Sequence, residues 1–183
     1  MHIEPATRED AAAILGLQHR AYQREAELYD SRSIPPLTQT LDALLAEFDD
    51  FHILKASIDG QLVGAVRAQI SDGICHIGRL MVEPSYQGRG IGQRLMQAIE
   101  AALVPAQCYE LFTGERSVRN VALYEYLGYR TVRTAKLNAV VTLVYMQKPC
   151  RGEASPSIEP AFPNYMAGEA SPLRITDSPP PEG

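Results

Sequence analysis

The sequence predicts one mixed domain of the α/β (α+β) class, and three patterns support this prediction. Apolar runs of strand length alternate with segments of helical periodicity between Ile3 and Gln147. The dipeptide Asp59-Gly60 separates two strand-like runs, as is typical of a hairpin turn. A glycine-rich turn at 88–92 joins another strand-like run to an amphipathic segment. We therefore expect a sheet flanked by helices.

The first elements should be a short strand around Ile3 and a long helix. Thr7 has the chemistry of an N-cap, with Asp10 three positions later, and the helix should run to about Tyr29. We expect Pro35-Pro36 to break it, since proline removes a backbone donor. The residues of this helix that should face the core are Ile14, Leu15 and Leu17.

A second helix and a hairpin should follow. Thr40 can cap a helix over Leu41 to Phe48, whose apolar face contains Leu41, Leu44, Leu45 and Phe48. The runs His52 to Ile58 and Leu62 to Ile70 read as the paired strands of the hairpin.

The central strand is expected over Ile74 to Val82, followed by the glycine turn and a helix that Pro105 stops. A strand over Tyr109 to Thr113 comes next, and then a helix that starts near Ser117. The first of these helices should bury Ile91, Leu95, Ile99 and Leu103, and the second Val118, Ala122, Leu123 and Leu127.

The last elements should be two strands, Tyr129 to Lys136 and Ala139 to Gln147. Gly128 separates them from the preceding helix, because it can take the left-handed position after a helix end.

The glycine turn has the chemistry of an anion site. Gly88, Gly90 and Gly92 allow the main chain to approach an anion closely, and the first amides of the next helix lack intrahelical partners. The helix dipole adds about half a positive charge there, and Arg89 or Arg94 can add more. We therefore predict a pyrophosphate-binding turn, with a simple surface turn as the alternative.

The glycine spacing discriminates between phosphate-binding folds. A dinucleotide motif needs a third glycine where Gln93 stands, and no P-loop sequence occurs, although Glu110 keeps a nucleotide fold open. The residues that do match are Gln87, Gly90 and Gly92, in Gln-x-x-Gly-x-Gly after Leu80-Met81-Val82. This pattern resembles the acyl-CoA-binding loop of the GNAT superfamily of N-acyltransferases.

A second stretch is similar to the same superfamily. Asn120 is followed four residues later by Tyr124, and the run ends at Leu127-Gly128-Tyr129. The two residues lie one turn apart on one helical face. The resemblance covers about residues 1–148 and implies a mixed, mostly antiparallel sheet flanked by helices. For Tyr124 the alternative is a packing residue beside Leu123 and Leu127.

The resemblance implies acetyl transfer from acetyl-CoA to a primary amine by direct attack in a ternary complex. Tyr124 would be the general acid, and the Met81 or Val82 backbone amide the oxyanion donor. The positions implied to bind the donor are Leu80, Met81, Val82, Gln87, Gly88, Arg89, Gly90, Ile91, Gly92, Gln93, Asn120 and Tyr124.

The general base is not determined by the sequence. Glu25, His76, Glu83 and Glu110 are all possible by residue type, and a water chain can also remove the proton. Strand alternation places His76 on the face of Ile74, Leu80 and Val82, which also allows a core histidine. We do not expect an acyl-enzyme on Cys75, because no neighbouring base activates it.

In this superfamily the first helix pair and its loop cover the acceptor, which implies acceptor contacts for Tyr22, Glu25, Tyr29 and Arg32. A small-molecule amine is favoured, while amino acid, aminoglycoside and protein amine acceptors all stay open. The other function class is an acyl-CoA sensor module without turnover. A homodimer is possible, since dimers are common in the superfamily.

Charge is unevenly distributed along a chain of net charge −5. Residues 1–51 hold ten acids and four bases, net −6, and residues 52–148 hold seven acids and eleven bases, net +4. The acidic part suits a cationic acceptor and the basic part a phosphorylated donor. Without a basic stripe or interleaved aromatic residues, nucleic acid is not an expected partner.

The last 35 residues, Pro149 to Gly183, contain 8 of the 13 prolines. They should form a mobile tail after one domain at 1–148. No apolar run reaches the ~20 residues of a membrane span, and the amino terminus lacks the pattern of a signal peptide. We therefore expect a cytoplasmic protein without membrane contact. Neither its three cysteines nor its four histidines show metal-ligand spacing, so no metal is expected.

Overall fold

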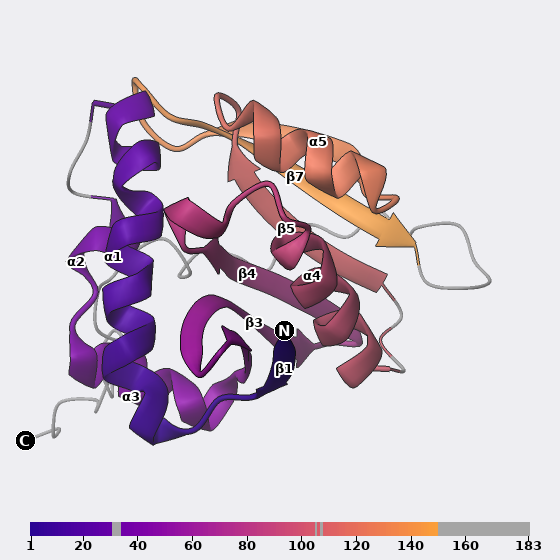
Figure 1. The fold of residues 1–183 in the computed structure, drawn as a ribbon. Coiled ribbons are helices and arrows are strands. Elements are labelled where there is room, and N and C mark those ends of the chain that lie inside the picture. The colour runs from indigo at the N-terminus through magenta and orange to yellow at the C-terminus, as the bar shows by residue number, and fades with distance from the viewer. Residues whose placement is uncertain (31–33, 105, 107, 150–183) are drawn as a thin grey trace, which may run out of the picture.

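A single seven-stranded sheet forms the centre of the structure, a computed structural model that describes residues 1–30, 34–104, 106 and 108–149. The strand order is β1-β2-β3-β4-β5-β7-β6 (Figure 1). Only β4 and β5 run parallel, and every other neighbouring pair is antiparallel. The expectation of a mixed, mostly antiparallel sheet is confirmed. The strands are β1 (His2–Pro5), β2 (His52–Ile58), β3 (Gln61–Ser71), β4 (Ile74–Val82), β5 (Cys108–Gly114), β6 (Arg130–Lys136) and β7 (Thr142–Pro149).

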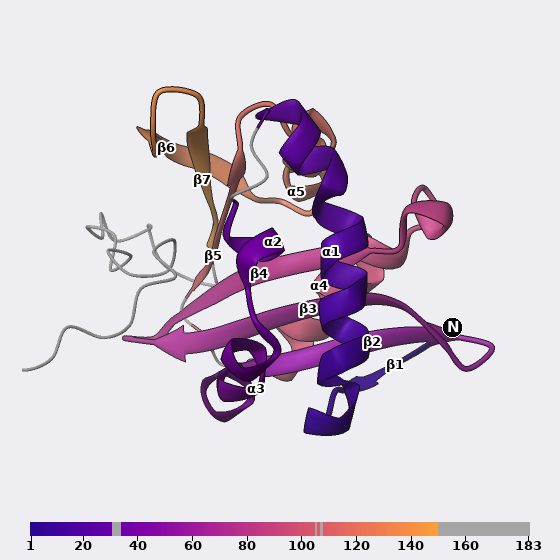
Figure 2. The same ribbon diagram turned by 90° about the vertical axis from the view of Figure 1, so that its left-hand side faces the viewer.

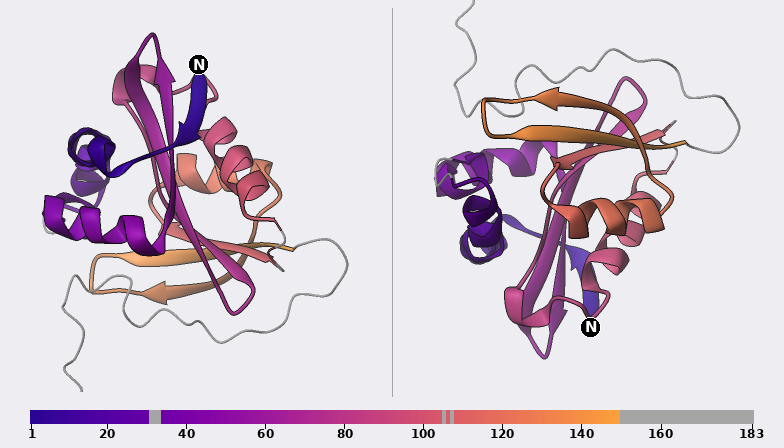
Figure 3. Two further views of the ribbon diagram at one scale, coloured as in Figure 1. Left: turned by 90° about the horizontal axis from the view of Figure 1, so that it is seen from below. Right: turned by 90° about the horizontal axis from the view of Figure 1, so that it is seen from above.

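Helices cover both faces of the sheet (Figures 2 and 3). On one face α1 and α3 pack over a cluster that includes Ile14, Leu17 and Ala65. On the other face α4 and α5 cover a larger cluster, with Val66, Leu95 and Ile99 fully buried. The helices are α1 (Ala11–Leu28), the single turn α2 (Pro35–Thr38), α3 (Leu41–Asp50), α4 (Ile91–Ala102) and α5 (Val118–Tyr126), with 3-10 turns η1 (Arg8–Asp10) and η2 (Pro84–Tyr86).

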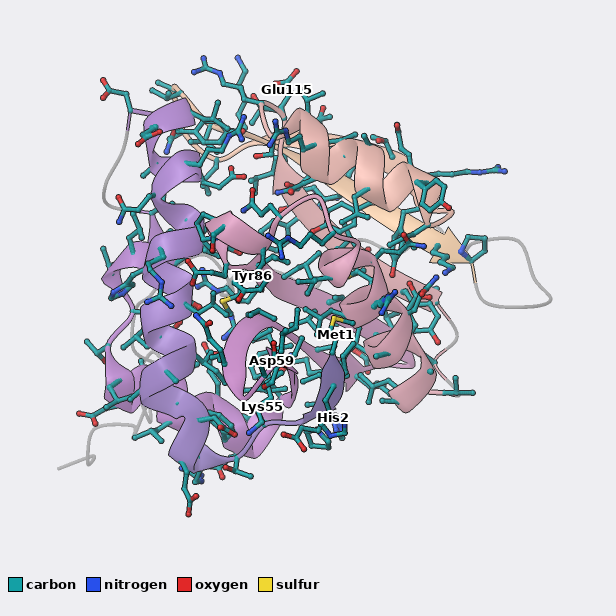
Figure 4. All side chains as sticks on the ribbon, in the orientation of Figure 1. Met1, His2, Lys55, Asp59, Tyr86 and Glu115 are labelled. Carbon is teal, nitrogen blue, oxygen red and sulfur yellow. The ribbon has the colours of Figure 1, made fainter. Side chains whose placement is uncertain are left out.

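The start of α1 is fixed to the sheet by Asp10. Its carboxylate accepts hydrogen bonds from the Thr7 amide at 2.8 Å and from the Lys55 ammonium of β2 at 2.7 and 2.8 Å (Lys55 is labelled in Figure 4). Partial burial favours the neutral acid, but these bonds outweigh it and lower the pKa of Asp10. Thr7 and Asp10 thus open a 3-10 turn directly before the predicted helix.

Most predicted elements are present, and several details of the sequence prediction are wrong. Pro35-Pro36 does not break α1, which already ends at Leu28; the two prolines form the first turn of α2, where a missing donor costs nothing. The last strand begins at Thr142 rather than Ala139 because the Asn138 side chain accepts from the Val140 and Val141 amides in a turn.

The third correction concerns α5. Val118 is 70 % exposed, and Ala122 is exposed as well. The buried side chain of this helix is Tyr124, with Val121 and Leu123 packed beside it. The helix is rotated relative to the prediction, since the buried aromatic ring fixes which face meets the sheet. Leu41 of α3 is also exposed, while the rest of its apolar face is covered.

A bulge in β4 opens the sheet. Between the pairs Ala65↔Met81 and Arg67↔Gly78, β4 has one more residue than β3, and Arg79 there has a φ of +50°. Farther along, β4 pairs with β5 only at residues 74–76, opposite 108–110. Figure 2 shows β5 turning away from β4 beyond these pairs. We call the edges of residues 77–82 of β4 and 111–114 of β5, which do not pair with each other, the β4–β5 split.

The bulge also corrects the predicted face of His76. Cys75 and Ile77 belong to the cluster under α4, and Leu80 and Val82 pack against the same cluster. His76 therefore lies on the opposite face from Leu80 and Val82. Simple alternation fails here because the extra residue shifts the side-chain period by one.

Candidate active site

The glycine turn lies where the sequence predicts, at the amino terminus of α4. Gly88 and Gly90 have φ values of +77° and +76°, and a Cβ on either would meet nothing within 4 Å. Gly90 is the N-cap of α4, and the first helix bond joins the Arg94 amide to the Gly90 carbonyl at 3.1 Å. The amides of residues 91–93 have no partner among the described residues. Unpartnered amides at a helix amino terminus fit a pyrophosphate.

Gly92 differs from the other two glycines. It lies inside α4 without a positive φ, and a Cβ there would lie 3.5 Å from Leu123 Cδ2, an ordinary contact. The expectation that its conformation requires glycine is wrong. Ile91 is 2 % exposed, so its side chain anchors the helix and only its amide faces the turn.

Polar side chains of the glycine turn hold it in place through hydrogen bonds to backbone carbonyl groups. Gln87 Nε2 donates to the Val82 carbonyl at 3.3 Å, which ties the turn to the end of β4. Arg89 donates to the Ser85 carbonyl at 3.3 Å, and its guanidinium lies 4.8 Å from the ring centre of Tyr86 (labelled in Figure 4). Gln93 is half-buried on the first turn of α4.

The strand end Leu80–Val82 borders the β4–β5 split. The Glu83 amide donates to the Val63 carbonyl of β3 at 2.9 Å. Since successive residues direct their backbone groups to opposite strand edges, the Met81 amide faces β3 and the Val82 amide faces the split. The Val82 carbonyl accepts the hydrogen bond from Gln87, which agrees with this orientation. Of the two predicted oxyanion donors, Val82 is therefore the one in position.

Tyr124 is the buried residue of α5, with 7 % of its surface exposed. Its ring packs edge-on against Tyr129, with 6.0 Å between ring centres. Burial, and then the neighbouring Tyr22 and Glu25, raise the pKa of Tyr124 well above its usual value of 10. Its hydroxyl therefore keeps its proton and can donate it. The ring packs, as the alternative predicted, and the role of the hydroxyl as general acid stays a prediction.

Glu25 of α1 is brought against α5 and was predicted both as an acceptor contact and as a base candidate. One carboxylate oxygen accepts from Ser117 Oγ at 2.5 Å, and the other accepts from Asn120 Nδ2 at 3.3 Å. Asn120 also lies 3.5 Å from Thr113 Oγ1 of β5. Sequence reasoning missed Ser117 and Thr113 as members of this group, since neither carries a motif signal.

The other residues predicted to contact the acceptor differ in where they lie. Tyr22 lies one helical turn before Glu25, beneath the guanidinium of Arg79, whose central carbon is 5.9 Å from the ring centre. Tyr29 is 5 % exposed, and its hydroxyl accepts from the Arg116 amide at 2.9 Å, so we reassign it to packing. Arg32 lies outside the described residues.

The remaining base candidates lie elsewhere. Glu83 is paired with Arg20 of α1 at 2.9 Å. His76 Nδ1 is 3.7 Å from Glu110 Oε1 at the closed end of the split, and Gln147 donates to Glu110 at 2.7 Å. Burial lowers the pKa of His76, with Glu110 and Asp72 opposing the shift only in part. His76 is thus a buried, neutral histidine, as the packing alternative predicted.

Within the described ranges, no group of three or more metal-ligating side chains is close enough to hold an ion. Among the same residues, no helix combines the length and apolarity needed to cross a membrane. Arg79 was missed by the sequence reading, although an arginine inside the apolar run of β4 is a usable signal.

A family profile described as the acetyltransferase (GNAT) family matches residues 14–129. Among curated proteins, the chain is similar to the UPF0157 protein YqkA of Bacillus subtilis, with 29 % identity over 126 residues. That match covers 69 % of this chain but only 36 % of the relative, so the chain spans about a third of that protein's length.

Solved structures share the fold at low identity. The protein smu.2055 of Streptococcus mutans has a TM-score of 0.70 and 17 % identity, over 81 % of this chain and 99 % of that one. The ribosomal-protein-S18-alanine N-acetyltransferase of Escherichia coli has a TM-score of 0.68 and 16 % identity, over 86 % of this chain and 98 % of that one. The protein yncA of Salmonella typhimurium, whose structure was solved with acetyl-CoA, has a TM-score of 0.66 and 20 % identity, over 85 % of this chain and 97 % of that one.

Proposed function

Because this chain belongs to the acetyltransferase (GNAT) family, we propose that it moves an acetyl group from acetyl-CoA to the primary amine of a small molecule. The observation that carries the proposal is the meeting of Tyr124, Asn120 and Glu25 beside the β4–β5 split. The donor-binding turn opens at one side of the split, and α1 covers the other. Donor and acceptor can therefore meet there without a covalent enzyme intermediate.

The donor would be held by backbone groups. The unpartnered amides of residues 91–93 take the pyrophosphate, assisted by the α4 dipole. The edge of Leu80–Val82 and the side chain of Asn120 position the acyl end of the donor. Gln87 maintains the turn through its bond to Val82.

The chain then has three chemical tasks. Glu25 accepts a proton from the ammonium group, directly or through water, so that the amine nitrogen can attack the thioester carbon. The Val82 amide donates to the carbonyl oxygen as negative charge develops on it. When the carbon–sulfur bond breaks, Tyr124 donates its proton to the departing sulfur, and the phenolate is reprotonated as the attacking nitrogen loses its second proton. The raised pKa of Tyr124 keeps the hydroxyl protonated but also makes it a weaker acid than free tyrosine, so donation to the thiolate is uphill.

The test is a panel of amines incubated with acetyl-CoA, read by a thiol reagent and by mass spectrometry of the acceptor. We expect thiol release that depends on the acceptor, together with an acceptor heavier by one acetyl group. A thermal shift with acetyl-CoA but no release from any amine would contradict turnover. That result would leave an acyl-CoA-binding module, the other function class that the glycine turn supports.

A further inference from the structure

We infer that the acceptor of the proposed reaction is a free α-amino acid, with Arg79 as the group that binds its carboxylate and Glu25 as the group that faces its amine. This inference rests on the proposed function and names the substrate class of the same site. It starts from an arginine that neither the family motifs nor the donor explains.

Arg79 occupies a costly position. Its φ of +50° lies in the left-handed region, which non-glycine residues rarely adopt because the Cβ then crowds the following carbonyl oxygen. The bulge in β4 holds it there, and such outliers cluster at ligand sites. Its side chain is only partly exposed, and residues 77–82 of β4 around it are otherwise apolar.

The guanidinium also has unused donors. Its Nε is buried, and no described residue accepts a hydrogen bond from it. The described ion pairs do not include Arg79 either, so its charge is balanced by no neighbouring carboxylate. Leaving a buried donor unpaired is unfavourable, and a ligand carboxylate would satisfy it through two parallel hydrogen bonds.

Arg79 faces the acceptor side of the sheet. It stacks over Tyr22 of α1, whereas the neighbouring Leu80 and Val82 side chains pack toward α4, the helix of the donor turn. The donor's phosphates belong at the amino terminus of α4, so they do not explain this cation. The anion that Arg79 binds should therefore come from the acceptor.

Glu25 supplies the opposite charge on the same side. Tyr22 and Glu25 lie three residues apart on α1 and therefore share a helical face. Glu25 also accepts from Asn120, one turn before Tyr124 on α5, which places the amine near the proposed general acid. Tyr22 thus has a cation, Arg79, over its ring and a carboxylate, Glu25, one helical turn away, and a zwitterion carries the charge complementary to each. A polyamine or a peptide amino terminus offers no carboxylate beside its amine.

The experiment compares matched acceptors. Several amino acids, the corresponding amines without the carboxylate, and the corresponding amino-acid amides are assayed with saturating acetyl-CoA. We expect kcat/KM for the free amino acids to exceed that of their partners by at least about tenfold. Arg79→Gln should lower kcat/KM for amino acids by about 10- to 100-fold, as expected for a lost charge-assisted pair. Arg79→Gln should leave kcat/KM for the decarboxylated amines and the KM for acetyl-CoA nearly unchanged.

Two further variants make the result interpretable. Arg79→Lys keeps the charge but loses the paired donors, so it should recover only part of the activity. Arg130→Gln removes an exposed arginine of the edge strand β6 and should behave as the wild type. An acetyl-CoA thermal shift equal to the wild type establishes that each variant is folded.

The outcomes separate the two proposals. If decarboxylated amines react as well as amino acids, or if Arg79→Gln affects both equally, the inference is overturned while acetyl transfer stands. If nothing releases thiol, the proposed function fails, and amino-acid binding in the presence of coenzyme A decides the inference. Binding that Arg79→Gln abolishes supports it, and no binding to the wild type overturns it.

Discussion

At the residue scale, the proton on Tyr124 is the property that matters most for the proposed chemistry. Its burial against Tyr129 and the nearby Glu25 raise the pKa, so the hydroxyl stays neutral. Tyr124→Phe removes only that hydroxyl and keeps the ring packing. We expect kcat to fall by about 10²-fold, the size of a lost general acid, with the acetyl-CoA thermal shift unchanged.

The matched control is Tyr126→Phe, because Tyr126 lies on the same helix and is 76 % exposed. Steady-state assays at saturating acetyl-CoA should give it the wild-type kcat. An unchanged kcat in Tyr124→Phe would show that the ring serves packing alone.

Gly90 tests the donor site. In Gly90→Asp, a Cβ is forced into a positive φ, and a carboxylate meets the place proposed for the pyrophosphate. We expect the stabilisation by acetyl-CoA to be lost; for the wild type it should reach about 2.7 kcal/mol at 100 times Kd.

The control for the backbone effect is Gly60→Asp. Gly60 has nearly the same φ, +77°, with nothing within 4 Å of a Cβ, but it lies in the turn between β2 and β3. Both variants should lose similar stability without ligand, measured by thermal unfolding. A normal acetyl-CoA shift in Gly90→Asp would place the donor elsewhere.

At the element scale, Tyr29 joins the end of α1 to the end of β5. A Cβ at Gly114 would lie 2.1 Å from the Tyr29 hydroxyl oxygen, far below any contact distance. Gly114→Ala must therefore displace Tyr29, which also breaks its bond with the Arg116 amide. We expect a loss of about 1–3 kcal/mol in unfolding free energy, measured by urea denaturation.

Gly16→Ala provides the comparison. Gly16 lies inside α1, and its nearest contact would be the flexible end of Arg20 at 3.4 Å. Alanine favours the helix, so this variant should be neutral or more stable by up to about 1 kcal/mol. If Gly114→Ala is equally harmless, Tyr29 does not fasten α1.

At the scale of the whole molecule, the buried His76 predicts lower stability in acid. Its pKa is lower in the folded protein than in the unfolded chain, mainly through burial. The unfolded chain therefore binds more protons as the pH falls below about 6.5, and folding weakens. Unfolding free energy measured between pH 7 and pH 5 should fall less steeply in His76→Gln. His2→Gln, at an exposed histidine, should keep the wild-type slope.

The domain boundary is also a prediction for the whole molecule. Residues 150–183 lie outside the described part, and the last described strand, β7, ends at Pro149, which pairs with Cys108. Truncation after Pro149 should leave both the melting temperature and the affinity for acetyl-CoA nearly unchanged. A melting temperature lower by several degrees would mean that the tail belongs to the core.

The sequence was sufficient for local structure and for the donor turn. Glycines at 88 and 90 have functions that only their backbone freedom explains, and alternating apolar periods define all seven strands to within a few residues. Such features depend on neighbours in the chain, so they can be read without the fold. The family resemblance added Asn120 and Tyr124 on one helical face, where the structure has them.

What only the tertiary structure decided are the contacts between distant segments. The bulge at Arg79 shifts the strand period, so alternation assigned His76 to the wrong face. Glu25 reaches Asn120 across 95 positions, and no sequence pattern encodes that distance. Local propensity determines the elements, but packing against β5 and α1 determines which charged groups surround Tyr124. The glycine turn could therefore be predicted from the sequence, and its binding of the donor stays a prediction, whereas the contacts of Glu25 and Arg79 required the fold.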